Sequence, residues 1–566
     1  MTVRLLPEIL RDRAAGHGDR QAYVFLDEHG TEKAVLSYAD LHERALAIAE
    51  RLHHRSAPGN TALLVFPQSL DFIAAYFGCL YANIIAVPVN PPRNGRVQDA
   101  TRSIVADCAP AVVLTTEAML DTARLALAPH CPSAHWLPVD RLSSTVDRSF
   151  EPRPSAPDDI AFLQYTSGST ADPKGVLISH RNLIANQEMI KYGFGHDERS
   201  TVVGWAPFFH DQGLIGNVLQ PLYVGATSIL MSPTAFIRWP ILWLSAISRY
   251  RAHTSGGPNF AYEVCAARAA RGNLPELDLS CWQVAFNGAE PIRAETLRRF
   301  TDAFAPFGFS DRAHYPCYGL AESTLIVTGS RRQRGARTVD ADTEALGSRR
   351  YVPGTGRTLV GSGTVLPGED LRIVDPDTGL PCPPDAVGEI WVAGDHVAQG
   401  YRQRPEATAA TFHAELAGRR YLRTGDLGVL VDEELYVVGR LKDLLIIRGR
   451  NHYPQDIEHT SASAHPALHA GGCAAFSVPG RDGEKLIVVQ EIGRDHRRDA
   501  DAADVTASIR AAITREHQLA VGDIVLTAPS QLQKTSSGKI RRAAARERYL
   551  AADFKLWTTN REDART

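Results

Sequence analysis

The 566-residue chain is too long for one ordinary hydrophobic core, which predicts at least two domains. Hydrophobic residues make up 44% and charged residues 22%, as in soluble globular proteins, and a formal net charge of -3 argues against a broad basic face for nucleic acid. The eight cysteines lack CxxC spacing, which argues against a disulfide framework or a zinc site and favours a reducing cytoplasm.

The N-terminal residues carry charges where a signal peptide would need an apolar run. Phe72 to Val89 is almost uninterrupted apolar sequence, close to the length of a membrane span. A glycine, an asparagine and a proline interrupt it, and basic flanks are missing. We therefore expect no membrane span, but a buried helix from Asp71 to about Tyr81 followed by a buried strand.

Short apolar runs rich in β-branched residues alternate with helix-like stretches through most of the chain. The amphipathic stretches Tyr38–Leu52 and Asn182–Lys191 predict helices, and Ser179 is the candidate cap of the second. The predicted strands are Thr61–Phe66, Ile84–Val87, Ala111–Thr115, Ile160–Tyr165, Val176–Ile178, Ser228–Met231 and Val284–Asn287. This alternation predicts an α/β fold of parallel-sheet subdomains with helices on their faces.

The pattern changes at Gly329–Gly363, which is rich in Arg, Gly, Thr and Asp and has no sustained period. We predict an inserted loop or hairpin on the surface, with the insertion at about residues 331–358. A small β unit follows, with strands at Leu371–Val374 and Glu389–Ala393. The charged junction Gly439–Asp443 separates two apolar strand candidates, and we place a boundary there between domains 1–440 and 441–566.

The second domain is predicted to be a small α+β unit. Ala474–Val478 and Leu486–Glu491 predict a hairpin. Val505–Leu519 predicts an amphipathic helix, with an apolar face formed by Val505, Ile509, Ala512 and Ile513.

A Ser/Thr/Gly-rich loop at residues 166–175 directly follows the predicted strand Ile160–Tyr165. Small hydroxyl residues and glycine let backbone N–H groups approach an anion, and Lys174 adds a positive charge. The loop lacks the GxxxxGK[ST] pattern, and a Gly-rich segment at residues 354–363 lacks the third glycine of the dinucleotide pattern. On composition alone, a phosphate site and an ordinary polar turn both remain open.

Four further motifs follow in the chain: Tyr318–Ser323, Tyr421–Gly428, Gly439–Asp443 and Gln533–Lys539. Together with the loop they resemble the adenylate-forming family of acyl-CoA synthetases, luciferases and non-ribosomal adenylation domains. The resemblance covers almost the whole chain. Ala171 stands where the family usually has glycine, and Gln533 stands where proline is common.

Within that family the chain is similar to the fatty acyl-AMP ligases, which load acyl chains onto carrier proteins. The segments Phe208–Ile215 and Ser255–Tyr262 resemble the acyl-site motifs of that branch, and Gly449–Glu458 replaces the pattern usual in CoA ligases. The irregular stretch at about residues 331–358 falls where the branch carries an insertion.

The resemblance implies that ATP and Mg²⁺ activate a medium- or long-chain fatty acid as an acyl-adenylate with release of pyrophosphate. A carboxylic acid has a reference pKa near ~4 and arrives ionised, so the difficulty is to bring two anions together. Lys539 would bridge the attacking carboxylate and the α-phosphate, and Glu322 would bind Mg²⁺. The structural alternatives are a solvated basic tail for Lys539 and a surface carboxylate for Glu322.

The remaining site residues are also implied by the resemblance. The phosphate-binding set is Thr166, Ser167, Gly168, Ser169, Thr170 and Lys174. The adenine and ribose set is Gly288, Ala289, Glu290, Tyr318, Gly319, Asp426 and Arg440. His210, Gly257 and Pro258 would bind the acyl substrate, with His210 beside its carboxylate, and Lys442 would be the hinge. Core packing for Tyr318, a turn role for Asp426 and a structural role for His210 are the alternatives.

In the second half-reaction the small domain would rotate about the hinge, so that a thiol could attack the acyl-adenylate. The expected acceptor is the phosphopantetheine of an acyl carrier protein, for example beside a polyketide or peptide synthase. A conventional acyl-CoA synthetase is the enzyme alternative, and a non-catalytic acyl-binding protein of the same fold is the other. Residues Asp432–Glu434 lack the glycine usual at this tight turn, which leaves the turn type open.

Overall fold

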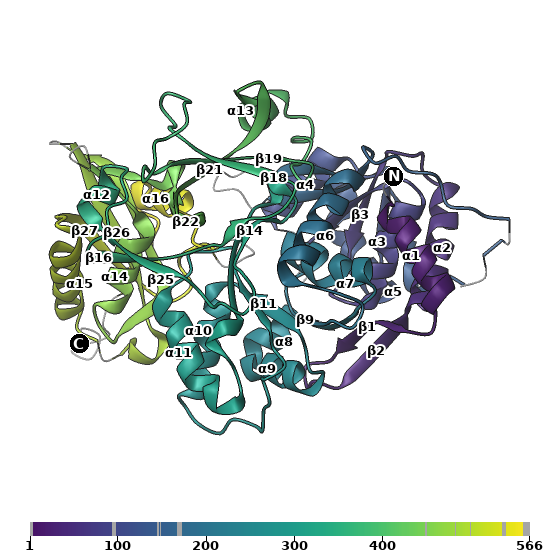
Figure 1. Ribbon diagram of the computed structural model, residues 1–566, viewed down its shortest axis with the longest axis horizontal. Coiled ribbons are helices and arrows are strands. Elements are labelled where there is room, and N and C mark those ends of the chain that lie inside the picture. The colour runs from purple at the N-terminus through teal and green to yellow at the C-terminus, as the bar shows by residue number, and fades with distance from the viewer. Residues whose placement is uncertain are drawn as a thin grey trace, which may run out of the picture.

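The computed structural model describes residues 4–92, 98–143, 146–147, 149–166, 173–447, 450–480, 483–498, 500–534 and 539–557. It has a large N-terminal α/β domain and a small C-terminal α+β domain (Figure 1). The C-terminal elements, yellow-green in Figure 1, gather at one end of the molecule. The predicted fold class is confirmed.

Two mainly parallel sheets form the large domain. The first has the order β17 (Thr364–Val365), β14 (Ile326–Gly329), β13 (His314–Gly319), β12 (Val284–Asn287), β11 (Thr254–Gly257), β9 (Thr201–Gly204), β10 (Thr227–Met231), β1 (Gln21–Leu26) and β2 (Glu32–Ser37). The second has the order β6 (His135–Pro138), β5 (Val112–Thr115), β3 (Thr61–Val65), β4 (Ile85–Val89), β7 (Ile160–Thr166) and β8 (Lys174–Ser179). All seven strands predicted from the sequence lie in these sheets.

Helices flank both sheets: α1 (Leu6–His17), α2 (Tyr38–His53), α3 (Leu70–Tyr81), α4 (Asp99–Cys108), α5 (Glu117–Leu127), α6 (His180–Phe194), α7 (Gln220–Val224), α8 (Pro233–Arg238), α9 (Pro240–Arg249), α10 (Asn259–Ala269) and α11 (Ala294–Phe304). Ser179 caps α6 as predicted, because its hydroxyl accepts a hydrogen bond from the backbone N–H of Asn182.

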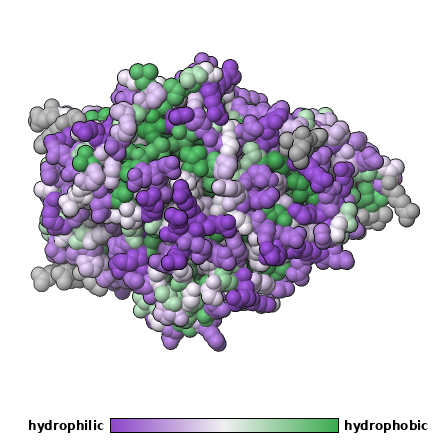
Figure 2. Space-filling view, viewed as in Figure 1, coloured by the Kyte–Doolittle hydropathy of each residue, from purple (hydrophilic) through white to green (hydrophobic). Residues whose placement is uncertain are grey.

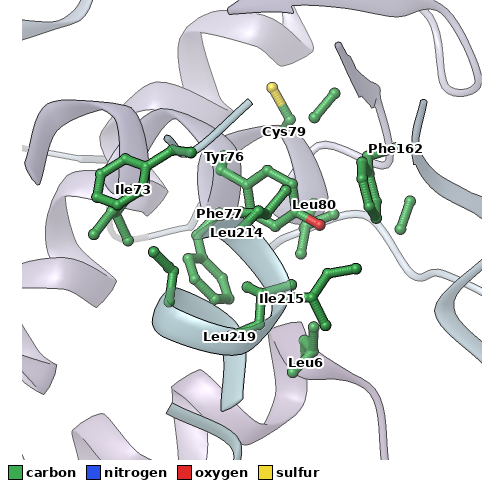
Figure 3. Close-up of a cluster of buried hydrophobic side chains, with 14 of the residues drawn as sticks. Leu6, Ile73, Tyr76, Phe77, Cys79, Leu80, Phe162, Leu214, Ile215 and Leu219 are labelled. Atoms are coloured by element: carbon green, nitrogen blue, oxygen red, sulfur yellow. The ribbon is translucent and has the colours of Figure 1, made fainter. Parts of the chain in front are cut away.

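The apolar run after Asp71 forms α3, all of whose residues except the first-turn Asp71 are buried. Its side chains pack against Phe162 of β7 and against Leu214, Ile215 and Leu219 of η3 (Gln212–Leu219), a π-helix (Figure 3). This packing explains the apolar composition as core. In the part of the chain that the structure describes, no helix combines the length and the hydrophobicity that a membrane crossing needs. The face shown in Figure 2 is mostly hydrophilic, with a larger hydrophobic area where Figure 1 draws β19 and β21.

The small β unit contains β18 (Glu369–Val374), β19 (Gly388–Gly394), β20 (Ala414–Leu416), β21 (Arg419–Val431) and β22 (Glu434–Arg440), with α13 (Pro405–Phe412) before β20. Asp432 and Glu433 join β21 to β22, and both have positive φ, 50° and 66°. Two such residues in a two-residue loop are the signature of a type I′ turn, so this hairpin forms without the glycine usual there.

The C-terminal domain contains β23 (Leu445–Ile447), β24 (Arg450–His452), α14 (Pro454–Ser463), β25 (Leu468–Gly480), β26 (Gly483–Ile492), α15 (Ala502–His517), β27 (Val521–Thr527) and α16 (Arg542–Leu550). The predicted hairpin is the antiparallel pair β25–β26. The predicted apolar face of α15 is buried at all four positions, and Val505, Ile509 and Ile513 belong to a core that joins β23, α14 and the three-stranded sheet.

The segment predicted as an insertion forms a hairpin of β15 (Thr338–Asp342) and β16 (Gly356–Val360), with α12 (Thr343–Gly347) between them. It is not entirely a surface feature. Ala341, Leu346 and Tyr351 are buried against β21 and β22. Figure 1 shows α12 and β16 among the C-terminal elements.

Candidate adenylating site

The β7–β8 hairpin holds the two ends of the predicted phosphate loop together, because Thr166 lies opposite Lys174 in its register. Ser167, Gly168, Ser169 and Thr170 lie outside the described residues, so their role stays a prediction.

Lys174 lies among charged groups from distant parts of the chain. Its Nζ is 4.6 Å from the centre of the Tyr401 ring. Burial and the charge of Lys442 lower the pKa of Lys174, while the Glu322 carboxylate opposes this shift. The Tyr401 hydroxyl donates a hydrogen bond of 2.8 Å to Oε1 of Glu322. The predicted phosphate lysine, metal ligand and hinge lysine thus lie in one neighbourhood, and Tyr401, which the sequence analysis missed, connects two of them.

One segment, residues 398–402, holds Glu322 and β8 in a fixed relation. The Ala398 N–H donates to the carbonyl of Glu322 at 2.9 Å. The Leu177 N–H donates to the carbonyl of Gly400, and the Arg402 N–H donates to the carbonyl of Gly175. The metal-ligand candidate and the strand that leaves the phosphate loop are therefore parts of one hydrogen-bonded unit.

The backbone beside Glu322 is strained. Thr324 has φ 70° and ψ -64°, a region that β-branched residues rarely adopt, and its hydroxyl donates to the carbonyl of His396 at 2.6 Å. Such strain costs on the order of 1–3 kcal/mol and concentrates at functional sites. It supports a functional role for Glu322, two residues before Thr324.

Tyr318, Asp426 and Arg440 form a chain of contacts across β13, β21 and β22. The Tyr318 hydroxyl donates to Oδ2 of Asp426 at 2.8 Å, and Nε of Arg440 lies 3.3 Å from Oδ1. Burial raises the pKa of Tyr318, and the Asp426 carboxylate raises the pKa of Arg440. The predicted adenine residue Tyr318 is thus brought together with the predicted ribose residues Asp426 and Arg440, which follow it by more than a hundred positions in the sequence.

The predicted adenine segment Gly288–Glu290 follows β12, the neighbour of β13. A Cβ at Gly288 would lie 2.9 Å from the carbonyl oxygen of Cys317, and one at Gly319 would lie 1.7 Å from that of Leu325. Both positions therefore need glycine. Asn287, directly before this segment, is fully buried, and neither polar atom of its side chain has a hydrogen-bond partner. No sequence motif marks this amide, which is a further candidate for the nucleotide site.

His210 and Asp211 directly precede the π-helix η3, and the Asp211 carboxylate accepts a hydrogen bond from the Gln212 N–H at 2.7 Å. π-helical segments are rare and frequently lie at functional sites. The His210 and Phe209 rings are 4.8 Å apart. The side chains of this stretch therefore lie at an irregular point of the backbone.

The charge of Lys539 reaches two carboxyl groups of the large domain. Burial raises the pKa of Asp211, and the nearby Lys539 ammonium opposes that rise. The pKa of Glu290 responds in the same way to burial and to Lys539. Oε1 of Glu290 accepts a hydrogen bond of 2.6 Å from the Phe260 N–H. Lys539 of the C-terminal domain therefore lies beside the predicted adenine and acyl segments.

Gly257 ends β11, and Pro258 is the N-cap residue of α10. A Cβ at Gly257 would lie 2.5 Å from Cζ2 of Trp205, so glycine is required for this close approach. The Trp205 ring stacks on Phe236 at 4.0 Å and lies 5.9 Å from Phe260. Three aromatic side chains, Trp205, Phe236 and Phe260, therefore pack together beside the predicted acyl-binding residue Gly257. Phe208, at the start of the other predicted acyl-site motif, is buried against Phe72.

The inserted hairpin contacts the C-terminal domain through polar groups. Arg450 pairs with Glu344 at 2.8 Å, the Asn451 amide donates to the carbonyl of Gly347 at 3.0 Å, and the Tyr453 hydroxyl donates to that of Leu346 at 3.3 Å. Arg357 pairs with Asp456 at 3.1 Å, and both side chains are largely buried. These contacts stabilise the observed position of the small domain against the inserted hairpin.

Comparison with known proteins agrees with this geometry. Residues 10–402 match the model of the family described as "AMP-binding enzyme", and residues 442–559 match "Disco-interacting protein 2-like, AMP domain". The chain is 42% identical to "Medium-chain-fatty-acid--[acyl-carrier-protein] ligase JamA" of Moorena producens (strain JHB), over 98% of this chain and 96% of the relative. It is 37% identical to "Long-chain-fatty-acid--AMP ligase FadD26" of Mycobacterium marinum (strain ATCC BAA-535 / M), over 98% of each.

Solved structures give the same result. A structure from work on fatty acyl-adenylate ligases of E. coli and L. pneumophila has a TM-score of 0.86 and 33% identity, over 97% of this chain and 98% of that one. The fatty acyl-adenylate ligase from L. pneumophila in complex with acyl adenylate and pyrophosphate has a TM-score of 0.76 and 38% identity, over 98% of each. The chain belongs to the AMP-binding enzyme family, in its fatty acyl-AMP ligase branch.

Proposed function

We propose that this protein uses ATP and Mg²⁺ to convert a medium- or long-chain fatty acid to an acyl-adenylate and then transfers the acyl group to the phosphopantetheine thiol of an acyl carrier protein. The position of Lys539 carries the proposal. Its charge acts on Asp211 and Glu290, beside the segments expected to bind the acyl carboxylate and the adenine.

In the first step a carboxylate oxygen attacks the α-phosphorus of ATP. The bond between that phosphorus and the bridging oxygen to the β-phosphate breaks, and pyrophosphate leaves. The carboxylate is already ionised, so the chain supplies positive charge and alignment rather than a general base. Lys539 bridges the attacking carboxylate and the α-phosphate, and Lys174 adds positive charge at the phosphate loop. Asp426 and Arg440 bind the ribose.

The residues present fit a bound Mg²⁺. The described residues include no group of three or more His, Cys, Asp or Glu side chains that could hold a metal ion. Mg²⁺ is often bound by one or two carboxylates together with water and substrate phosphates, so Glu322 would suffice on the protein side. When bound, the ion would neutralise charge on the phosphate oxygens.

The acceptor is supported by the printed name of the relative from Moorena producens and by the contacts of the inserted hairpin. A thiol reaches the adenylate only if Lys539 withdraws, and this rotation must break the contacts of Arg450, Asn451, Tyr453 and Asp456 with the large domain. A carrier protein offers a larger binding surface than free CoA does. Its binding could therefore offset the free energy needed to break these contacts. Acyl-adenylate should therefore accumulate in the presence of CoA.

Product analysis tests both steps. The enzyme is incubated with ATP, Mg²⁺ and a medium- or long-chain fatty acid, alone, with CoA, or with a phosphopantetheinylated carrier protein. Acyl-adenylate alone in the first two reactions and acyl-carrier protein in the third would support the proposal. Robust acyl-CoA formation would identify CoA as the acceptor, and absence of adenylate in every reaction would favour a non-catalytic acyl-binding protein.

A further inference from the structure

Arg542 is a largely buried arginine at the start of α16, three residues after Lys539. Its Nε and Nη2 atoms lie 2.7 Å and 2.8 Å from the two carboxylate oxygens of Glu458 on α14, and its Nη1 lies 2.6 Å from Oδ2 of Asp443. Burial alone would lower the pKa of Arg542, yet the two carboxylates raise it above its usual value. A planar guanidinium makes such a forked contact with fixed geometry, which a lysine cannot reproduce.

Asp443 belongs to the junction between the domains. It ends η7 (Leu441–Asp443), a short 3₁₀ helix. On the other side of the junction, Arg440 ends β22 and pairs with Asp426 of β21, its register neighbour. One ion pair therefore ties Arg440 to the large domain, a second ties Asp443 to the small domain, and Leu441 and Lys442 are the two residues between them.

Two backbone contacts join the residues on either side of the segment that carries Lys539. The Arg541 N–H donates to the carbonyl of Gln533 at 2.9 Å, and Lys534 pairs with Ile540 in an isolated β-bridge. Arg542 follows directly, so its bonds to Asp443 and Glu458 fix the base of this segment to the junction and to α14.

We propose that Arg542 is a positioning residue that makes Asp443 part of the small domain, confines the pivot to Leu441 and Lys442, and thereby keeps Lys539 aligned. A longer or looser pivot would let the small domain sample more orientations, and the fraction of time that Lys539 spends in the adenylating position would fall. ATP would still bind, because Tyr318, Asp426 and Glu322 belong to the large domain. The inference rests on the proposed function for its kinetic readout, but its effect on the pivot can be measured independently.

The test compares Arg542→Met, Arg542→Lys and Asp443→Asn with the control Arg546→Met in the full-length protein. Arg546 lies one turn further along α16 and bonds the carbonyl of Ser477, not a carboxylate. Two quantities are measured: fatty-acid-dependent ATP–pyrophosphate exchange, and the rate of tryptic cleavage after Arg440 or Lys442, followed by mass spectrometry of the two fragments. Asp443→Asn keeps the Arg542–Glu458 pair, so the inference remains testable if Arg542→Met does not fold.

Arg542→Met should lower kcat for exchange about 100-fold with KM for ATP changed less than about threefold, since small misalignments of a catalytic group have effects of that size. Asp443→Asn should lower kcat in the same direction. Both should cleave about tenfold faster in the pivot, a consequence of local opening, whereas Arg546→Met should match the wild type in both assays. Arg542→Lys should recover part of the lost kcat.

Two results would separate this inference from the proposed function. If the wild type performs exchange but neither Arg542→Met nor Asp443→Asn changes pivot cleavage, the inference is wrong and the function stands. If the wild type performs no exchange but both variants open the pivot, the structural role of Arg542 stands and the proposed function fails. A loss of kcat accompanied by an equally large rise in KM for ATP would also overturn the inference, because it would indicate damage to the large domain.

Discussion

The hydroxyl of Tyr401 donates a 2.8 Å hydrogen bond to Glu322, while its ring lies 4.6 Å below the ammonium group of Lys174. One side chain therefore contacts both the expected metal ligand and the expected phosphate lysine. Its two contacts can be removed separately, because the hydroxyl contacts Glu322 and the ring contacts Lys174.

Tyr401→Phe keeps the ring and removes the hydroxyl. Hydrogen bonds to charged groups are worth about 1.5–3 kcal/mol, so the Mg²⁺ concentration for half-maximal adenylate formation should rise at least ~10-fold. A Mg²⁺ titration of the exchange reaction measures this. Tyr250→Phe, which removes a similar bond to the remote Glu32, is the control and should have no effect. An unchanged Mg²⁺ requirement would show that Tyr401 does not orient Glu322.

Lys539→Ala removes the charge that acts on Asp211 and Glu290. We expect adenylate formation to fall by about 10²–10³-fold or more, as when one preorganised group that stabilises developing charge is lost. ATP binding, measured by calorimetry, should persist. Lys555→Ala is the matched control at an exposed position. Near-normal adenylate formation would remove Lys539 from the catalytic residues.

Three buried histidines make stability depend on pH. Burial lowers the pKa of His180 to about 4, of His196 to about 3 and of His314 to about 4. The unfolded chain therefore binds protons that the folded chain does not, and stability present above pH ~6.5 decreases as the pH falls towards ~4, by at most about 1.4 kcal/mol per histidine and pH unit.

Melting temperatures measured between pH 7.5 and pH 4.5 would test this dependence. His314→Asn should give a shallower decrease than the wild type, while His29→Gln, at an exposed position, should not. A melting temperature that stays constant over this range would contradict the prediction.

The Arg357→Met variant tests whether contacts of the inserted hairpin hold the small domain in its observed position. Arg357 pairs with Asp456, lies over the Tyr453 ring and donates to the carbonyl of Val438. Breaking a largely buried ion pair costs up to ~3–5 kcal/mol, so the adenylating arrangement should be less populated. We expect slower adenylate formation and the appearance of some acyl-CoA when CoA is supplied. Arg372→Met, on the exposed side of β18, is the control. Unchanged rates and products would mean that this contact does not restrain the domain.

Local patterns predicted what depends on local structure. The cap Ser179 and the apolar face of α15 follow from spacings of a few residues, and both are confirmed. The buried part of the insertion was missed, because Leu346 and Tyr351 are covered by β21 and β22, which lie far later in the sequence. Tyr401 and Asn287 were missed for a related reason. Their importance lies in what they contact or fail to contact, which no sequence period reveals.

Because η3 is a π-helix, the geometry of the site depends on the number of residues in this segment as well as on their chemical identity. Each residue of an α-helix advances the chain by about 100° around the helix axis. Deleting one residue within Gln212–Leu219 would convert the π-helical turn to an α-helical turn and would rotate the residues that precede it relative to α7. His210 and Asp211 would then leave the site although neither had been replaced. Variation in this segment is therefore expected to occur by substitution and not by insertion or deletion.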